Sequence, residues 1–178
     1  MLYDASLSIQ QTDFSIDGET ASALKKVRQV VNIFDAHAMH EEQFILPAIR
    51  QYEPSLVDAF ELEHIEDHTL TEKLRGLLSV YSYAIKTEVK IETGRAITRS
   101  FEEFMIFNLQ HMTKEETVLN KVLWRYYTDS EIQDMSKRIV SSLPHEEAAI
   151  TSAWMMRGMS NTESGGRSRL SRAPCGSS

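Results

Sequence analysis

The stretch His37-Ala-Met-His-Glu41-Glu42 recurs further along the chain as His111-Met-Thr-Lys-Glu115-Glu116, and His64-Ile-Glu-Asp-His68 lies between the two copies. Residues four apart on an α-helix point in nearly the same direction, so each stretch presents two side chains on one face. Helical bundles build metal sites from imidazoles and carboxylates that project inward from separate helices. The sequence therefore predicts an all-α protein with a metal site between three helices.

The histidines and glutamates of the repeated stretch continue apolar stripes, which is unusual for such residues. The first stripe comprises Val27, Val30, Phe34, His37, Glu41, then Phe44 or Ile45, and Ala48; the later one comprises Phe104, Phe107, His111, Glu115, Val118 and Val122. A carboxylate on a core-facing stripe is costly unless a partner or a metal compensates it. The candidate ligands are His37, Glu41, His64, His68, His111 and Glu115.

Several neighbouring polar residues receive other roles. A single histidine on an apolar face is more often a hydrogen-bonded core residue than a ligand, and only the repetition favours metal here. Glu42 and Glu116 are rotated by about 100° from the ligand glutamates, so they are expected at the surface or behind the ligands. His40 lies on an adjacent face within reach of the site, and His145 is expected to be exposed.

Apolar spacing of three and four residues predicts long helices and no strands. The expected helices cover residues 19–52, 55–87 and 94–127, with Glu53-Pro54-Ser55 as the first turn. The second turn is expected within 86–93, centred near Val89 and Lys90. Thr128-Asp129-Ser130 should cap a short further helix, and Ser142-Leu-Pro144 should start the last one. Pro47 is expected to kink the end of the first long helix.

Composition indicates one domain over residues 1–163, with its core in 19–127, followed by a disordered Ser/Gly/Arg tail over 164–178. The net charge of −7 argues against nucleic acid and anionic membranes as partners. The single cysteine, Cys175, favours a reducing compartment, and no signal or membrane-spanning run is evident. The expected location is the cytoplasm.

The repeated His-x-x-x-Glu-Glu with His-x-x-x-His between resembles the hemerythrin-like, His/His/Glu cation-binding family over roughly residues 12–163. The resemblance implies an up-and-down antiparallel four-helix bundle that holds two non-haem irons and binds or senses dioxygen, nitric oxide or iron. It implies that His64, His68 and His111 serve one iron, that His37 serves the other, and that Glu41 and Glu115 bridge them. A single iron, manganese or zinc is the alternative cofactor.

The chain departs from the family pattern at its start, because no histidine precedes His37. The first helix is therefore expected to be shortened, and the chain resembles a family member truncated at the first helix and at the C-terminus. Weaker binding of the second metal and a homodimer through exposed core are expected consequences.

Two alternative functions remain open beside ligand binding or sensing. A di-iron oxidase or ferroxidase-type enzyme is less favoured, because the Glu-x-x-His motif of such catalysts occurs only once, as Glu61-Leu-Glu-His64. A metal-poor helical interaction or regulatory module would follow from the missing first-helix histidine.

Overall fold

The computed structural model describes residues 1–142, and within them it contains helices and no strand, as predicted. The elements are α1 (Leu2–Gln10), α2 (Asp17–His40), the π-turn η1 (Glu41–Ile45), α3 (Leu46–Arg50), α4 (Pro54–Tyr83), α5 (Thr87–Lys114), the π-turn η2 (Glu115–Leu119), α6 (Asn120–Tyr126) and α7 (Asp129–Ser142). The predicted last helix after Ser142, with His145, and the predicted tail over 164–178 lie outside the described residues.

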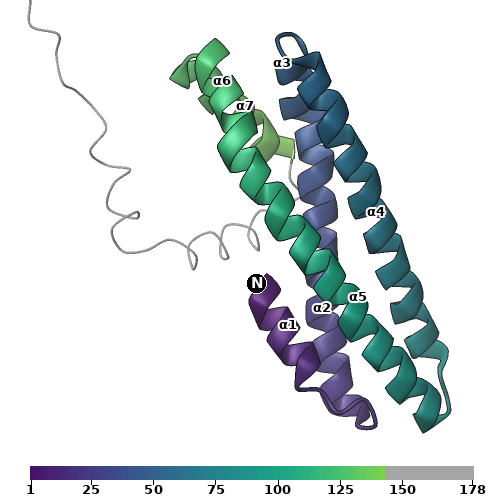
Figure 1. Cartoon of the computed structure of the whole chain (residues 1–178). Helices are drawn as coiled ribbons and strands as arrows, with labels where there is room; N and C mark the ends of the chain where they lie inside the picture. Colours follow the sequence, from purple (N-terminus) through teal and green to yellow (C-terminus); the bar gives the residue numbers. More distant parts are fainter. Residues whose placement is uncertain (143–178) are drawn as a thin grey trace, which may run out of the picture. The chain divides into compact units, whose positions relative to one another are not determined.

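The helices form an up-and-down bundle (Figure 1). α2, η1 and α3 make one continuous rod, and α5, η2 and α6 make another; α4 runs antiparallel between them. The short α1 packs against α2 and α5 and completes the ring of four. The predicted antiparallel helical bundle is confirmed, and its first helix, α1, has 9 residues.

The first turn lies where the sequence predicts it. Pro54 is the first residue of α4, a position where its missing N–H costs no helical hydrogen bond. The further cap is also confirmed: the Thr128 N–H donates to Glu131 Oε2 at 2.8 Å, and the Glu131 N–H donates to Thr128 Oγ1 at 3.4 Å. This reciprocal pair is a capping box at the start of α7.

The second turn lies earlier than predicted. α4 ends at Tyr83 and α5 begins at Thr87, so Val89 and Lys90 belong to the first turn of a helix rather than to a loop. The apolar pattern is weak there because that turn is largely exposed to solvent. Ala84 and Lys86 have extended backbone (ψ of 124° and 134°), so the short connection covers more length per residue than a helix does.

A polar layer divides the core of the bundle into two apolar clusters. The lower cluster includes Ile9, Val27, Leu74, Ile97 and Phe101, among other buried side chains. The upper cluster comprises Leu46, Ile49, Val57, Phe60, Leu119 and Leu123. Between them, all three long rods carry histidine, aspartate, glutamate or asparagine on their buried faces.

The π-turns correct the predicted stripes beyond Glu41 and Glu115. In the first rod the buried residues are Leu46 and Ile49 instead of Ile45 and Ala48. In the second rod, Leu119 and Leu123 are buried, whereas the predicted Val118 is 38% exposed. Each π-turn contains one residue more than an α-turn, which shifts the inward positions beyond it by one. At Pro47 the structure has a π-turn just before the proline, and the helix then continues to Arg50.

On the outer face of α1, apolar side chains are exposed to solvent, with Tyr3 70% and Leu7 55% exposed. Association of two copies through this region stays a prediction. Within the described part of the chain, every helix is too short or too polar to span a membrane.

Candidate metal centre

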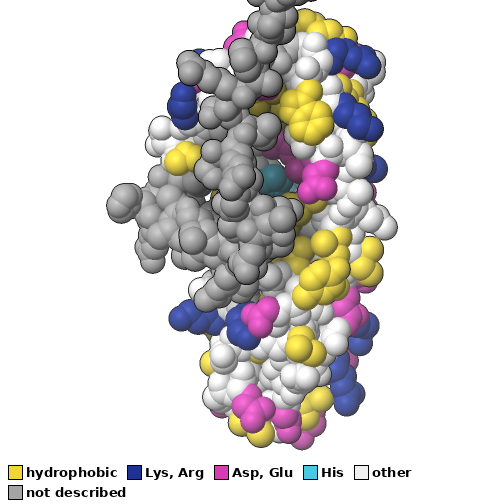
Figure 2. Space-filling view, turned by 90° about the vertical axis from the view of Figure 1, so that its left-hand side faces the viewer, with side chains coloured by type: hydrophobic (Ala, Val, Ile, Leu, Met, Phe, Trp, Pro, Cys, Tyr) yellow, Lys and Arg dark blue, Asp and Glu magenta, His cyan; other side chains and the backbone are white. Residues whose placement is uncertain are grey.

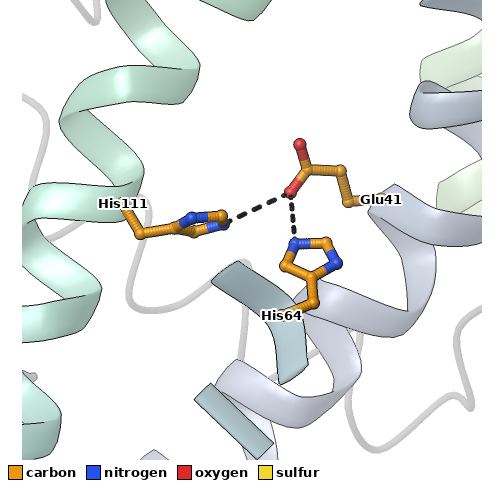
Figure 3. A group of neighbouring side chains, drawn as sticks. All are labelled: Glu41, His64 and His111. Atoms are coloured by element: carbon orange, nitrogen blue, oxygen red, sulfur yellow. Dashed lines mark ion pairs between the residues drawn. The ribbon is translucent and has the colours of Figure 1, made fainter. Parts of the chain in front are cut away.

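Glu41, His64 and His111 meet in the polar layer from three different rods (Figure 3). One ligand atom from each lies within 4.8 Å of the others. Glu41 Oε2 is 3.4 Å from His64 Nε2 and 3.7 Å from His111 Nε2. All three residues are 5% exposed. The structure thus brings these three predicted ligands together in the bundle interior.

The atoms that face one another in this group have no hydrogen-bond partner. Both carboxylate oxygens of Glu41, His64 Nε2 and His111 Nε2 are buried and make no hydrogen bond. Buried polar atoms are normally paired, because leaving one unpaired costs on the order of 1–3 kcal/mol. Two oxygens and two imidazole nitrogens that converge without hydrogen bonds form a donor set that a cation would satisfy.

The other ring nitrogen of each buried histidine is held by a carboxylate. His64 Nδ1 lies 3.0 Å from Glu42 Oε1, and His111 Nδ1 lies 2.9 Å from Glu63 Oε2. A proton on Nδ1, donated to the carboxylate, leaves the Nε2 lone pair free to bind a metal. Carboxylates placed in this way fix the tautomer and the orientation of metal-binding histidines.

A second group shares Glu41 with the first. It consists of His37, Glu41 and Glu115, again with ligand atoms within 4.8 Å. Glu115 Oε1 lies 3.0 Å from His37 Nε2 and 3.0 Å from His111 Nε2. Glu41 belongs to both groups, and Glu115 contacts one histidine of each. The two carboxylates therefore lie between His37 on one side and His64 and His111 on the other.

The charges of this cluster shift the ionisation of its members. Burial alone would lower the pKa of His111, but Glu115, Glu41 and Glu63 outweigh it and raise that pKa to about 10. Burial would raise the pKa of Glu115, but the neighbouring imidazoles of His111 and His37 instead lower it below its ordinary value. In the metal-free protein, the protonated imidazole of His111 therefore offsets the charge of the carboxylates, and a bound cation would take over this role.

Of the predicted ligands, His68 is the one that the structure keeps away from both groups. Its side chain is exposed, so the expectation that it faces inward with His64 is wrong. Asp67 occupies the inward position, 5% exposed, and accepts a hydrogen bond of 2.7 Å from Asn108 Nδ2. Burial raises the pKa of Asp67. The apolar stripe of α4 could have predicted this, because the position seven residues, or about two turns, before Leu74 on the same face is 67 and not 68.

Three further polar residues take positions that spacing alone left undecided or missed. Glu42 was expected either at the surface or behind the ligands. It is exposed, and its carboxylate contacts Nδ1 of His64, the ring nitrogen that faces away from Glu41. Glu63 had no predicted role, and its contact with His111 joins two rods that no sequence spacing relates. His40 is 7% exposed, stacks on Phe44 with a centroid separation of 6.5 Å, and belongs to neither ligand group.

The cluster is not sealed from solvent. The side chain of His37 is 40% exposed. Figure 2 shows a histidine at the bottom of a hollow on one face, with acidic side chains beside it.

Comparison with known proteins agrees with this geometry. The family model "Hemerythrin HHE cation binding domain" matches residues 8–123. The chain is also similar to F-box/LRR-repeat protein 5 of Salmo salar, with 27% identity over 156 residues, and of Mus musculus, with 24% over 162 residues. Each alignment covers 85% of this chain and 21% of the relative, so the chain spans about a fifth of the length of these curated relatives.

Proposed function

The chain belongs to the hemerythrin HHE cation-binding family, and we propose that it is a non-haem iron protein that binds or senses dioxygen, nitric oxide or iron. The proposal includes two irons, bridged by Glu41 and Glu115. One iron would be held by His64 and His111 and the other by His37. A single iron, or manganese or zinc in its place, is the narrower form of the same proposal, since the donors suit all three metals.

The strongest support for the proposal is the arrangement of the buried ligand atoms of Glu41, His64 and His111. Four buried ligand atoms of Glu41, His64 and His111 point at one another without a hydrogen bond. Without a cation at this place, the desolvation of these atoms is offset only by the ion pairs of Glu41 with His64 and His111 and of Glu115 with His111. The sharing of Glu41 between the two groups supports two cations rather than one.

The chain's own residues have defined tasks in this function. Glu42 and Glu63 hold the Nδ1 atoms of His64 and His111 and so aim their Nε2 atoms at Glu41. The rings of Phe60 and Phe107 pack against the imidazole of His111, with centroid separations of 5.5 Å and 6.2 Å. Both rings limit the access of water to His111. Iron held there would supply an open position for a diatomic ligand and a change of redox state.

The enzyme alternative receives little support from the residues around His64. Glu61, which would form the Glu-x-x-His motif, is half exposed and pairs with Arg50 Nη2 at 2.5 Å instead of facing the cluster. An oxidase or ferroxidase of the ferritin-like type needs such a glutamate in the interior.

Spectroscopy and metal analysis test this proposal. The protein is purified without added iron, its bound metals are measured, and absorption spectra of the iron-loaded form are recorded with and without dioxygen or nitric oxide. The expected result is iron at up to two per chain and a reversible, ligand-dependent absorption change. Turnover of peroxide or ferrous iron would favour the enzyme, and absence of any metal uptake would leave the interaction module.

A further inference from the structure

Asp67 is a buried carboxylic acid on the face of α4 that carries His64. It lies three residues after His64, and side chains at that spacing share one face of a helix. On α5, Asn108 lies three residues before His111, and its Nδ2 donates to Asp67 Oδ1 at 2.7 Å. The imidazoles of His64 and His111 have a centroid separation of 5.1 Å. The pair Asp67–Asn108 therefore lies directly next to this pair of histidines, on the side of the lower cluster.

The carboxyl group of Asp67 lacks the partners that a buried acid normally has. It is 5% exposed, and the hydrogen bond that it accepts comes from the neutral amide of Asn108. Among residues 1–142, no lysine, arginine or histidine forms an ion pair with it. Buried acids are rarely retained without a counter-charge or a metal ion. A cation bound by the neighbouring histidines would supply that counter-charge.

The electrostatics of Asp67 place it within range of the metal centre. Burial raises the pKa of Asp67, and the charges of His111 and His64 oppose that rise. The carboxyl group therefore interacts with both imidazoles although it contacts neither. A cation between these imidazoles would act on Asp67 in the same direction and more strongly, because it carries at least two charges.

The two sides of the histidine pair differ in polarity. Phe60 lies four residues before His64, is 3% exposed and packs against His111 at a centroid separation of 5.5 Å. Asp67 lies on the opposite side, three residues after His64. A polar ligand of the cation thus meets an aromatic ring on one side and a carboxyl group on the other.

The ligand set of this cation leaves room for such a ligand. Glu41, His64 and His111 provide two imidazoles and one carboxylate, a combination that typically leaves positions on a non-haem metal open. Asp67 lies outside the group whose ligand atoms are within 4.8 Å of one another. A carboxylate can still reach a metal ion through a bound water, because the metal–oxygen bond adds about 2 Å and the hydrogen bond about 2.6 Å.

We propose that Asp67 is an additional carboxylate of the metal centre and accepts a hydrogen bond from a water ligand of the cation at His64 and His111. The inference rests on the proposed metal-binding function. Asn108 positions Asp67 for this contact. Its Nδ2 also donates to the Phe104 carbonyl at 3.1 Å, which fixes the amide and directs it to Oδ1, so that Oδ2 remains for the water.

Asp67→Asn tests the inference, because asparagine has the same shape and keeps an oxygen for Asn108 but loses the negative charge. Binding of Co²⁺ and Fe²⁺ is measured by titration against a competing chelator, the Co²⁺ absorption bands report the surroundings of the metal, and thermal unfolding is followed on metal-free protein. The affinity is expected to fall by about 10–100-fold, the usual cost of removing a group that supports metal ligands. The Co²⁺ bands should shift, and the midpoint of metal-free unfolding should not fall, because a buried acid without a counter-charge has been removed.

Asp35→Asn is the matched control. Asp35 is a partly buried acid of α2 that pairs with Arg75, and its side chain is 27% exposed. Its replacement should lower the midpoint of metal-free unfolding and leave the Co²⁺ affinity and bands unchanged. Equal losses of affinity in Asp67→Asn and Asp35→Asn would overturn the inference, since any nearby negative charge would then have the same effect.

Unchanged affinity and unchanged Co²⁺ bands in Asp67→Asn would also overturn it and leave Asp67 as a link between α4 and α5. Asp67→Ser provides a second uncharged variant with a smaller side chain. If neither metal-free variant unfolds cooperatively, Asp67 serves the core and the inference is wrong. If the unaltered chain takes up no metal, the proposed function fails in a titration that involves no variant, and the inference fails with it.

Discussion

Replacing Glu41 with glutamine should remove more metal than the same change at any other glutamate within residues 1–142. Glu41 is 5% exposed and is the residue common to both ligand groups. Structural zinc sites with four ligands bind with roughly 10–16 kcal/mol, or about 3 kcal/mol per ligand. Each factor of ten in affinity corresponds to about 1.4 kcal/mol, so loss of one charged ligand should weaken the binding of each cation by roughly 100-fold.

Glu42→Gln and Glu116→Gln are the matched controls for this change. The Glu42 side chain is 54% exposed and contacts only the outer nitrogen of His64, so its loss should weaken binding by about tenfold at most. Glu116 is exposed and makes no contact with the cluster, and its replacement should leave affinity unchanged.

The assay is a titration of each metal-free protein with Fe²⁺ or Co²⁺ in competition with a chelator, together with metal analysis after dialysis. Circular dichroism of the metal-free variants verifies that each is folded. Equal losses for Glu41→Gln and Glu42→Gln would refute the assignment of Glu41 to the interior of the cluster. Full metal content in Glu41→Gln would refute its role as a shared ligand.

Three further predictions concern the other histidines, the core and the metal itself. His68→Ala should retain the metal affinity that His64→Ala loses by roughly 100-fold, as measured in the same titration; equal losses would place His68 at the site. Gly94→Ala should reduce the free energy of unfolding by about 1–2 kcal/mol in urea denaturation, because the added Cβ would overlap the ring of Phe14. Gly76 has open space around it, so Gly76→Ala should raise the free energy of unfolding by up to about 1 kcal/mol. If Gly94→Ala and Gly76→Ala changed the free energy of unfolding in the same direction, the packing described would be contradicted. Removing bound metal with a chelator should lower the thermal midpoint by several degrees, since a ligand at 100 times its Kd contributes about 2.7 kcal/mol; an unchanged midpoint would argue against a site formed only in the folded protein.

The sequence by itself determined the helices, the antiparallel order and most of the residues that meet at the candidate metal centre. Spacing within one helix is a local property, so the pairs His37/Glu41 and His111/Glu115 could be recognised without knowing the fold. The capping box at Thr128 and the turn at Pro54 are equally local, and both are confirmed.

Only the tertiary structure decided which face of α4 meets the other rods and how the rods continue beyond the ligands. One residue of an α-helix corresponds to about 100° of rotation, and that step separates a buried Asp67 from an exposed His68. The π-turns add one such step in each rod, and periodicity read along a straight helix contains no sign of it. The contact of Glu63 with His111 likewise depends on the rotation and height of two neighbouring helices, which packing sets and sequence spacing does not.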